Sequence, residues 1–343
     1  MKNIAYLSVI TFAILFTVGC SSVIRPINNI QVKDAYTGSM YKGNYIYGAA
    51  MNLAWNELMT DFTKGPVLLN TEDKSALETV EKFNQSIFTK DDLDFESYYV
   101  KTGYGQKMID KINIESKQKF PSKSFKDLEL KLRDADFVSY AYFLKEVEYP
   151  LAFKETQVGF LKDRVKGFYA DSDEQKNNVK IVKYWNDNKF IISLKLKDNT
   201  DELFLAKGIS IDDPLEVVDK INEYNKEAVL MNNKDNFRMP KLHLEHNRRY
   251  NEVEGNYLAN LGFEDYYIGV MYENIKFDLD EKGARVENEA VIGMLLGSAM
   301  ETRKIKIKNL VLDKPFWVVM KRKDSDNPYF ILGVNNTELM EKI

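Results

Sequence analysis

The spacing of hydrophobic residues changes along the chain, from a helical period in the first third to the alternation of strands after residue 136. The predicted helices of this first part cover 45–62, 76–88 and 105–118. In the first helix, Ala49, Leu53 and Trp55 recur at helical spacing. The second follows Thr71 and Asp73, either of which can cap it.

After residue 136, short segments rich in β-branched and aromatic residues alternate with turn residues. The predicted strands cover 137–153, 178–185, 189–197, 237–246, 273–281, 304–312, 315–323 and 329–334. One more helix is predicted at 212–225, with Asp212 or Asp213 as its cap and Pro214 in its first turn. Helices first and strands later indicate an α+β fold with large antiparallel sheets.

The segment from Lys276 to Ile307 combines a strand, a turn and a second alternating stretch. In the strand, Phe277 and Leu279 point to the face opposite that of Asp278. The turn that follows ends at Gly283, a residue available for positive φ. Beyond the turn, one face would carry Ala284, Val286, Asn288, Ala290, Ile292 and Met294, and the other Arg285, Glu287 and Glu289. A segment that is first exposed and later enters the core of a sheet needs this alternation.

The N-terminus resembles a bacterial lipoprotein signal. Lys2 precedes an apolar run, Ile4 to Val18, of about 15 residues, whereas a membrane span needs about 20. The run ends at the only cysteine, Cys20, which would become the lipidated first residue after cleavage. Thr17 departs from the usual leucine of the motif, and an ordinary secretory peptide is the alternative.

We therefore expect three parts in the chain: a signal peptide at 1–19, a polar tether at 20–41 and a single folded domain at 42–343. The mature protein would work outside the cytoplasm without an internal disulfide, because it has one cysteine. It would be anchored to a bacterial cell membrane or cell surface by a lipid on Cys20, or else secreted.

Most enzyme classes lack their residues in this sequence. The two histidines, His243 and His246, are three apart on a predicted strand and face opposite sides, so they cannot easily share a metal ion. The sequence has no Gly-x-Ser-x-Gly motif, no phosphate-binding glycine loop and no cysteine cluster. The acidic pairs Asp91–Asp92 and Asp212–Asp213 fit turns and caps. A net charge of −4 gives no indication of nucleic-acid binding. We expect no enzyme activity, no metal and no cofactor.

Several motifs in the second half of the chain resemble the serpin family. The sequence Met239-Pro240-Lys241-Leu242, followed by a segment with Leu261-Gly262-Phe263, resembles the serpin strand that leads into a short helix ending in Leu-Gly-Met. The stretch 277–284, FDLDEKGA, resembles the strand and hinge before the serpin reactive-centre loop. The stretch 313–336 resembles the C-terminal pair of strands. Weaker matches, "GPVLL", Ile112-Asn113 and "FVSYAYFLKE", occur earlier in the same order.

The resemblance implies a serpin-like fold with an exposed reactive-centre loop at about 281–303. The hinge would be Glu281, Lys282, Gly283 and Ala284. Val286, Asn288, Ala290, Ile292 and Met294 would form the inward face of the strand that inserts into a sheet after cleavage. The spacing from the hinge places the scissile bond between Gly297 and Ser298, with Met300 and Arg303 as alternatives. The partner would be a serine protease, with a cysteine protease as the alternative. The inhibitor would be a monomer.

Two functions remain open at this stage. The first is a suicide-substrate inhibitor that traps a protease by loop insertion. The second is a non-inhibitory serpin-fold surface lipoprotein that binds a ligand or partner, because inhibitory serpins favour small residues where this chain has Val286, Glu287, Asn288 and Glu289. An unrelated α+β lipoprotein with an ordinary edge strand is a third interpretation. If Ala284 to Met294 already formed the middle strand of the sheet, the structure would resemble only the latent or cleaved serpin topology. The function would then stay open.

Overall fold

The computed structural model describes residues 36–198, 200–287 and 307–343. Its α-helices are α2 (Ala50–Glu57), α3 (Lys74–Asn84), α4 (Gln106–Lys119), α5 (Asp173–Lys176) and α6 (Pro214–Tyr224). A π-helical segment, Leu58–Thr63, continues α2, and 3-10 turns lie at Lys90–Asp92, Phe95–Ser97 and Asn225–Glu227. The strands form three larger sheets and one two-stranded sheet.

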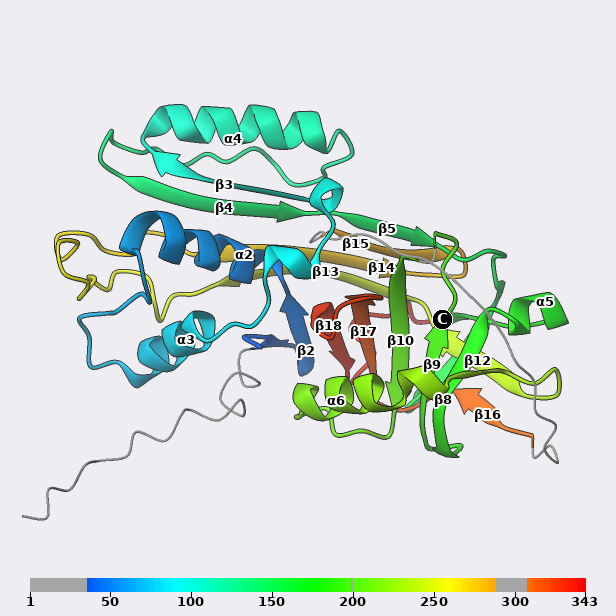
Figure 1. The fold of residues 1–343 in the computed structure, drawn as a ribbon. Helices are drawn as coiled ribbons and strands as arrows, with labels where there is room; N and C mark the ends of the chain where they lie inside the picture. The colour runs from blue at the N-terminus through cyan, green and yellow to red at the C-terminus, as the bar shows by residue number, and fades with distance from the viewer. Residues whose placement is uncertain (1–35, 199, 288–306) are drawn as a thin grey trace, which may run out of the picture.

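The largest sheet has eight strands in the order β1-β2-β18-β17-β10-β9-β8-β11, and all neighbours are antiparallel. The strands are β1 (Ser39–Tyr41), β2 (Asn44–Gly48), β8 (Val179–Asn186), β9 (Lys189–Leu194), β10 (Asp201–Lys207), β11 (Val229–Leu230), β17 (Phe316–Arg322) and β18 (Pro328–Val334). Helix α6 covers one face, where Val217 and Ile221 join a core with Phe204 and Trp317 (Figure 1). Burial on both faces explains the nearly continuous apolar sequence of β17 and β18.

A second sheet has the order β13-β14-β15-β5, with β13 at Leu242–Arg249, β14 at Tyr272–Leu279, β15 at Gly283–Glu287 and β5 at Lys145–Glu148. Strand β4 (Phe137–Phe143) runs directly into β5 and pairs with β3 (Tyr98–Tyr104) (Figure 1). The inner face packs on the eight-stranded sheet, where the rings of Phe277 and Phe330 lie 4.6 Å apart and those of Phe143 and Tyr329 5.3 Å apart.

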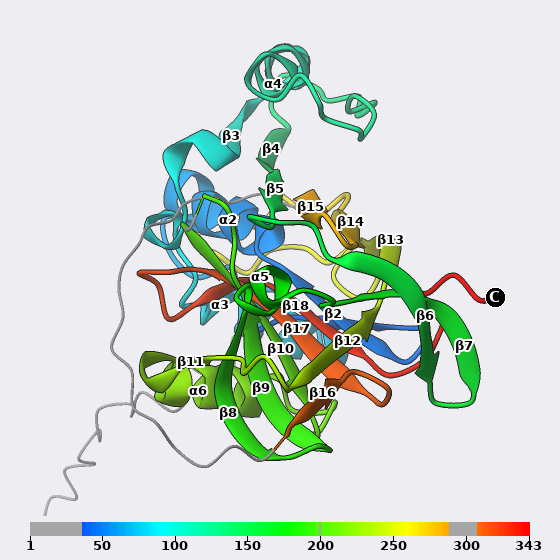
Figure 2. The same ribbon diagram turned by 90° about the vertical axis from the view of Figure 1, so that its right-hand side faces the viewer.

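The third sheet has the order β16-β12-β7-β6 and lies at one end of the molecule (Figure 2). Its strands are β6 (Lys154–Phe160), β7 (Asp163–Tyr169), β12 (Asn236–Pro240) and β16 (Asn309–Val311), and β12 and β16 are parallel. Phe168 and Phe237 from this sheet pack with Phe153, so the third sheet shares the main core.

The β3–β4 pair lies between two helices (Figures 1 and 2). Helix α4 packs on one side through Ile109 and Ile112, which contact Val138. Helix α2 lies on the other side, where the Ser139 hydroxyl donates to the carbonyl oxygen of Ala54 at 2.5 Å. No helix in the described ranges is long and apolar enough to cross a membrane.

The predicted α+β class with large antiparallel sheets is confirmed, and most predicted elements exist. The first predicted helix began too early, because the aromatic and β-branched residues 45–47 pair with β18 as strand β2. Asp73 caps α3 by accepting from Ser75 N at 2.8 Å, but α3 ends at Asn84, before the predicted residue 88. Asp213 caps α6 by accepting from Glu216 N at 3.0 Å.

Several strand predictions need correction. The segment 237–246 is not one strand, because Lys241 separates β12 and β13, which belong to different sheets. Strands β3, β6, β7 and β10 were not predicted from the sequence. The short helix expected before Gly262 is replaced by turns and by an isolated bridge between Tyr257 and Tyr267. Strand β1 lies inside the range predicted as tether, so the folded part begins before residue 42.

Candidate functional site: the hinge strand and its sheet

The predicted hinge leads directly into a strand inside the second sheet. Strand β15 lies between β14 and β5 and is antiparallel to both. Ala284 pairs with Leu279 on β14 and with Val147 on β5. The part of the predicted loop from Gly283 to Glu287 is therefore a central strand, although we expected it to be exposed.

The two faces of β15 differ as the alternation of its sequence indicates. Ala284 and Val286 are 5% and 0% exposed and belong to the main core. Arg285 lies on the outer face, where its guanidinium forms an ion pair with Glu146 of β5. The apolar face therefore packs against the eight-stranded sheet, and the charged residue remains near solvent.

Gly283 is required by close packing against the neighbouring backbone. It is not among the described glycines with positive φ, so the conformational reason given for it above is wrong. A Cβ atom at this position would lie 1.9 Å from the carbonyl oxygen of Val147 and 2.9 Å from Cα of Glu148. Only glycine permits this approach of β15 to β5 without a shift of the backbone.

The hinge turn is held by one carboxylate from within and one ion pair from outside. Asp280 Oδ1 accepts from the backbone N–H groups of Lys282 and Gly283 at 2.8 and 3.2 Å. Lys241, at the junction of β12 and β13, places its ammonium 2.5 Å from Glu281 Oε2 and also pairs with Glu155. Burial alone would raise the pKa of Glu281, but Lys241 outweighs this effect and lowers that pKa.

A buried ion pair lies beneath the hinge strand. Lys145, opposite Val286 in the register, is 1% exposed and lies 2.6 Å from Asp201 Oδ2 and 3.2 Å from Asp198 Oδ2. Asp201 is also buried, and burial raises its pKa, although Lys145 acts in the opposite direction. Removal of either partner from such a buried ion pair leaves the other charge uncompensated and away from water, which destabilises the fold.

The strands beside β15 extend beyond its described end. Residues 272–275 of β14 pair only with β13 in the described structure, and β4 pairs only with β3. The last described backbone pair of β15 joins Glu287 to Lys276 of β14.

The connection between α4 and β4 lies over the outer face of this sheet. Arg285 Nη2 donates to the Ser122 carbonyl oxygen at 3.3 Å, and the ammonium of Lys276 lies 5.3 Å from the centre of the Phe125 ring. Lys123 Nζ donates to the Tyr140 hydroxyl of β4 at 3.1 Å. The segment 122–125 therefore contacts side chains of β15, β14 and β4.

The chain returns to the fold at a fixed position after the segment that is not described. Backbone N–H groups of Lys308 and Asn309 donate to Asp235 Oδ1 at 2.7 Å and to Asp187 Oδ1 at 3.1 Å. Asn309 then begins β16, which pairs with β12. The described chain thus lies in the second sheet up to Glu287 and enters the third sheet at Asn309.

The remaining predicted site residues lie outside the described ranges, so the structure says nothing of their placement. They are Asn288, Ala290, Ile292, Met294, Gly297, Ser298, Met300, Arg303 and the predicted lipidation residue Cys20.

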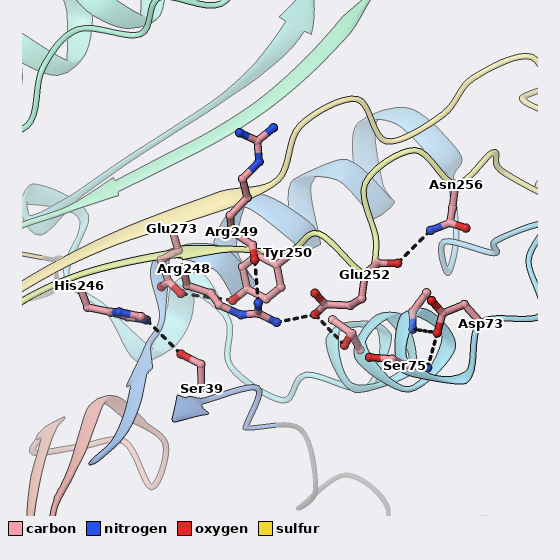
Figure 3. A network of polar contacts seen from close by, with 12 residues as sticks. Ser39, Asp73, Ser75, His246, Arg248, Arg249, Tyr250, Glu252, Asn256 and Glu273 are labelled. Atoms are coloured by element: carbon pink, nitrogen blue, oxygen red, sulfur yellow. Dashed lines mark hydrogen bonds and ion pairs between the residues drawn. The ribbon is translucent and has the colours of Figure 1, made fainter. Parts of the chain in front are cut away.

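The two histidines lie on opposite faces of β13, as expected. His243 is exposed, with Nδ1 2.5 Å from Asp278 Oδ1, whereas His246 is buried and its Nε2 lies 3.2 Å from the Ser39 hydroxyl (Figure 3). Burial, together with the charge of Arg248, lowers the pKa of His246. In the described ranges, no group of three or more histidine, cysteine, aspartate or glutamate side chains could hold a metal ion.

A polar network fixes the end of β13 beyond these histidines. Arg248 Nη2 lies 2.5 Å from Glu252 Oε1, and the Tyr250 hydroxyl donates to Glu273 at 3.3 Å (Figure 3). Arg249 pairs with Glu254 at 2.9 Å. The two arginine pairs connect β13 to the turn that follows it, and the Tyr250–Glu273 hydrogen bond connects this turn to β14.

The charged partners around the hinge could not be identified from the sequence. Lys145 with Asp201, Lys241 with Glu281 and Arg285 with Glu146 are each far apart in sequence, so only strand register and sheet packing identify them as pairs. The strand alternation of 283–287 was the one usable signal.

Comparison with known proteins identifies the architecture. No family model matches the sequence, and no curated protein matches it. A solved structure described as a loop C-sheet serpin polymer has a TM-score of 0.52 and 14% identity, covering 89% of this chain and 93% of that chain. The thermophilic serpin tengpin in its latent state gives 0.51 and 14% over 90% and 98%. A serpin from Schistosoma mansoni gives 0.50 and 10% over 89% and 98%. This chain therefore has the serpin fold.

Proposed function

We propose that this protein inhibits a protease as a suicide substrate, by cleavage of its loop and insertion of the cleaved strand into the second sheet. The observation that carries the proposal is the position of β15 between β14 and β5, antiparallel to both, with Ala284 and Val286 facing the core. A strand that lies between two others gains backbone hydrogen bonds on both sides.

In this mechanism the protease supplies the chemistry. Its serine oxygen, or a cysteine sulfur, attacks the carbonyl carbon of the scissile bond, which we place between Gly297 and Ser298, with Met300 or Arg303 as alternative sites. The residue after the bond leaves with a free amino group, and the residue before it remains bound to the protease as an acyl-enzyme. The chain that follows β15 then extends this strand within the sheet, where Ala284 and Val286 already face inward, and carries the protease with it. The inhibitor itself performs no catalysis.

The insertion face is energetically favourable. Ala284 and Val286 are already buried, so the gain comes from Ile292 and Met294, at about 1.5 to 3 kcal/mol each or about 3 to 6 kcal/mol together, with a smaller addition from Ala290. Burial of the Asn288 amide without partners would offset about 1 to 3 kcal/mol. The balance favours an extended β15 before its new backbone hydrogen bonds are counted.

The first experiment is a test for a trapped protease. The soluble form that begins at Ser21 would be mixed with elastase-like, trypsin-like and subtilisin-like proteases and run on a denaturing gel. We expect an SDS-resistant complex and loss of protease activity, and mass spectrometry of the released peptide would locate the scissile bond. Cleavage of the loop without a complex would contradict the proposal.

A matched pair of variants separates insertion from cleavage. Ile292→Asp places a charge on the predicted inward face of the inserting strand, whereas Ile114→Asp makes the same change at a 57% exposed isoleucine of α4. We expect Ile292→Asp to be cleaved but to form no complex, because burial of an unpaired carboxylate is strongly unfavourable. Ile114→Asp should behave as the parent protein. Equal complex formation by both variants would exclude insertion as far as Ile292.

A non-inhibitory binding role is the second candidate. It is favoured by the large residues of β15, because Arg285 and Val286 occupy positions near a hinge where rapid insertion favours small side chains. In that case β15 is a permanent strand of the sheet. Cleavage without a complex, together with unchanged thermal stability of the cleaved protein, would support this role.

We further infer that Cys20 carries a lipid that anchors the protein to the outside of a bacterial cell membrane. The apolar run that ends at Cys20 supports this inference. A Cys20→Ser variant should be released from the membrane fraction and should lose label from a fatty-acid precursor. Retention in the membrane would contradict the anchor. Gel filtration of the form that begins at Ser21 would test the expected monomer.

A further inference from the structure

One row of ionisable side chains crosses all four strands of the second sheet on its outer face. His243 of β13 is opposite Asp278 of β14, Asp278 is opposite Arg285 of β15, and Arg285 is opposite Glu146 of β5. Contacts join both ends of the row, because His243 lies 2.5 Å from Asp278 and Arg285 pairs with Glu146. Arg285 is therefore a cation between two carboxylate positions on neighbouring strands.

The next row on the same face has the opposite order of charges. Glu245 of β13 is opposite Lys276 of β14, and their charged atoms lie 3.3 Å apart. The backbone of Glu287 pairs with that of Lys276 on the other side. The neighbouring strands thus place the carboxylates of Asp278 and Glu146 beside the position of Arg285. Two residues further along β15, they place the ammonium of Lys276 opposite the backbone position of Glu287.

This pattern penalises every short shift of β15 along its neighbours. A shift by one residue would turn Arg285 into the core, where Ala284 and Val286 now lie. A shift by two residues in one direction would bring Arg285 opposite Lys276. A shift by two in the other direction would bring Glu287 between Asp278 and Glu146. Like charges directly opposite each other destabilise a strand pair.

The apolar face of β15 alone does not distinguish the observed register from registers shifted by two residues. A shift by two residues keeps the same side chains inward, because the period of a strand is two. The inward residues Ala284 and Val286 are both apolar, so their exchange by a two-residue shift is opposed mainly by shape. The outer charges distinguish the observed register from both neighbouring registers of the same face.

We propose that Arg285 is a positioning residue that fixes the register in which the hinge strand enters the sheet, through Asp278 and Glu146, and that Lys276 fixes the following position. The inference rests on the proposed insertion of the loop. In addition, charges on the outer face of the sheet determine the register of the inserted strand. The charged residues of β15 then fix this register and do not oppose insertion.

A disulfide that can form only in the observed register tests this proposal. Ala284 and Val147 are directly opposite each other, and the form beginning at Ser21 contains no other cysteine. The double variant Ala284→Cys with Val147→Cys should form a disulfide under mild oxidation, because directly opposite strand residues have suitable spacing. Mass spectrometry of peptides would measure its rate of formation.

Three additions to this double variant give the decisive comparison. Arg285→Glu should slow disulfide formation about tenfold, which corresponds to about 1.4 kcal/mol. Glu146→Arg added to Arg285→Glu should recover part of the rate, because it restores an ion pair of reversed polarity. Lys162→Glu, the same charge change at an exposed residue of the β6–β7 turn, should leave the rate unchanged. Hydrogen exchange of the β15 amides should change in the same order.

The outcomes separate this inference from the proposed function. Equal disulfide rates with Arg285 and with Glu at that position would overturn the role of Arg285, whatever the protease assay shows. Failure of the disulfide with Arg285 present would overturn the register itself. Normal disulfide formation with a tenfold effect of Arg285→Glu, but no trapped protease, would support the inference while contradicting inhibition.

Discussion

At the scale of single residues, the hinge depends on a glycine and an ion pair more than on its apolar side chains. Gly283 permits the approach of β15 to β5, and Glu281 connects the turn to Lys241 at the junction of two other strands. Both residues act through atoms that are distant in sequence. Their effects can be tested separately, because Gly283 acts through steric fit against β5 and Glu281 acts through its ion pair.

Gly283→Ala should destabilise the protein by about 1 to 3 kcal/mol, as expected for overpacking, because its Cβ would lie 1.9 Å from the Val147 carbonyl oxygen. Urea denaturation would measure the free energy of unfolding. Gly159→Ala in β6 is the control, since a Cβ there meets no atom within 4 Å. A similar stability for both variants would show that β15 does not approach β5 this closely.

The Glu281–Lys241 ion pair should make stability depend on pH. Because the folded protein lowers the pKa of Glu281, the pair stabilises the fold above the ordinary glutamate pKa of about 4.3, and this stabilisation is lost as the pH falls through the lower folded value. Glu281→Gln should therefore lose less stability than the parent protein between pH 5 and pH 3, as measured by thermal unfolding. Glu72→Gln, at an exposed residue, should follow the parent, and identical profiles for Glu281→Gln and the parent would contradict the expected role of the pair.

At the scale of elements, β15 depends on the strand beside it as much as on its own sequence. Strand β5 contributes Glu146 to the outer face and Lys145 to the inner face, so the same strand contacts both sides of the hinge. Lys145 connects β5 to β10 of the eight-stranded sheet through Asp201. The two sheets are therefore joined by charge as well as by apolar packing directly beneath β15.

Lys145→Met should destabilise the protein by about 3 to 5 kcal/mol, because it leaves the buried Asp201 without its cation. The double variant Lys145→Met with Asp201→Leu should recover most of this loss, since both buried charges are then removed. Chemical denaturation of the single and double variants would measure the difference. If the double variant were as unstable as the single variant, the loss would come from packing and not from the unpaired carboxylate.

At the scale of the whole molecule, the proposed insertion predicts that the cleaved protein is more stable than the intact one. A gain of about 3 to 6 kcal/mol from Ile292 and Met294 corresponds to a rise in Tm of about 5 to 10 °C for a chain of this size. Calorimetry before and after cleavage between residues 288 and 306 would measure this change. Cleaved Ile292→Asp should show no rise, and an unchanged Tm for the cleaved parent would favour the binding role.

The sequence predicted the parts of the fold that depend on neighbouring residues. Asp73 and Asp213 cap their helices because capping requires only the next few backbone N–H groups. Prediction was wrong where distant partners decide, as at residues 45–47, where pairing with β18 favours a strand over the helical spacing of nearby residues. For the same reason, the sequence did not show that Lys241 separates two strands that belong to different sheets.

By itself, the sequence determined which residues of 284–286 would face inward if this segment became a strand, because alternation is a local property of extended backbone. Only the tertiary structure decided that β15 lies between β14 and β5, that Gly283 is needed for close packing, and that Arg285 lies between Asp278 and Glu146. The contacts of β15 with β5 join segments more than a hundred residues apart, and their register is fixed by the packing of the complete sheet.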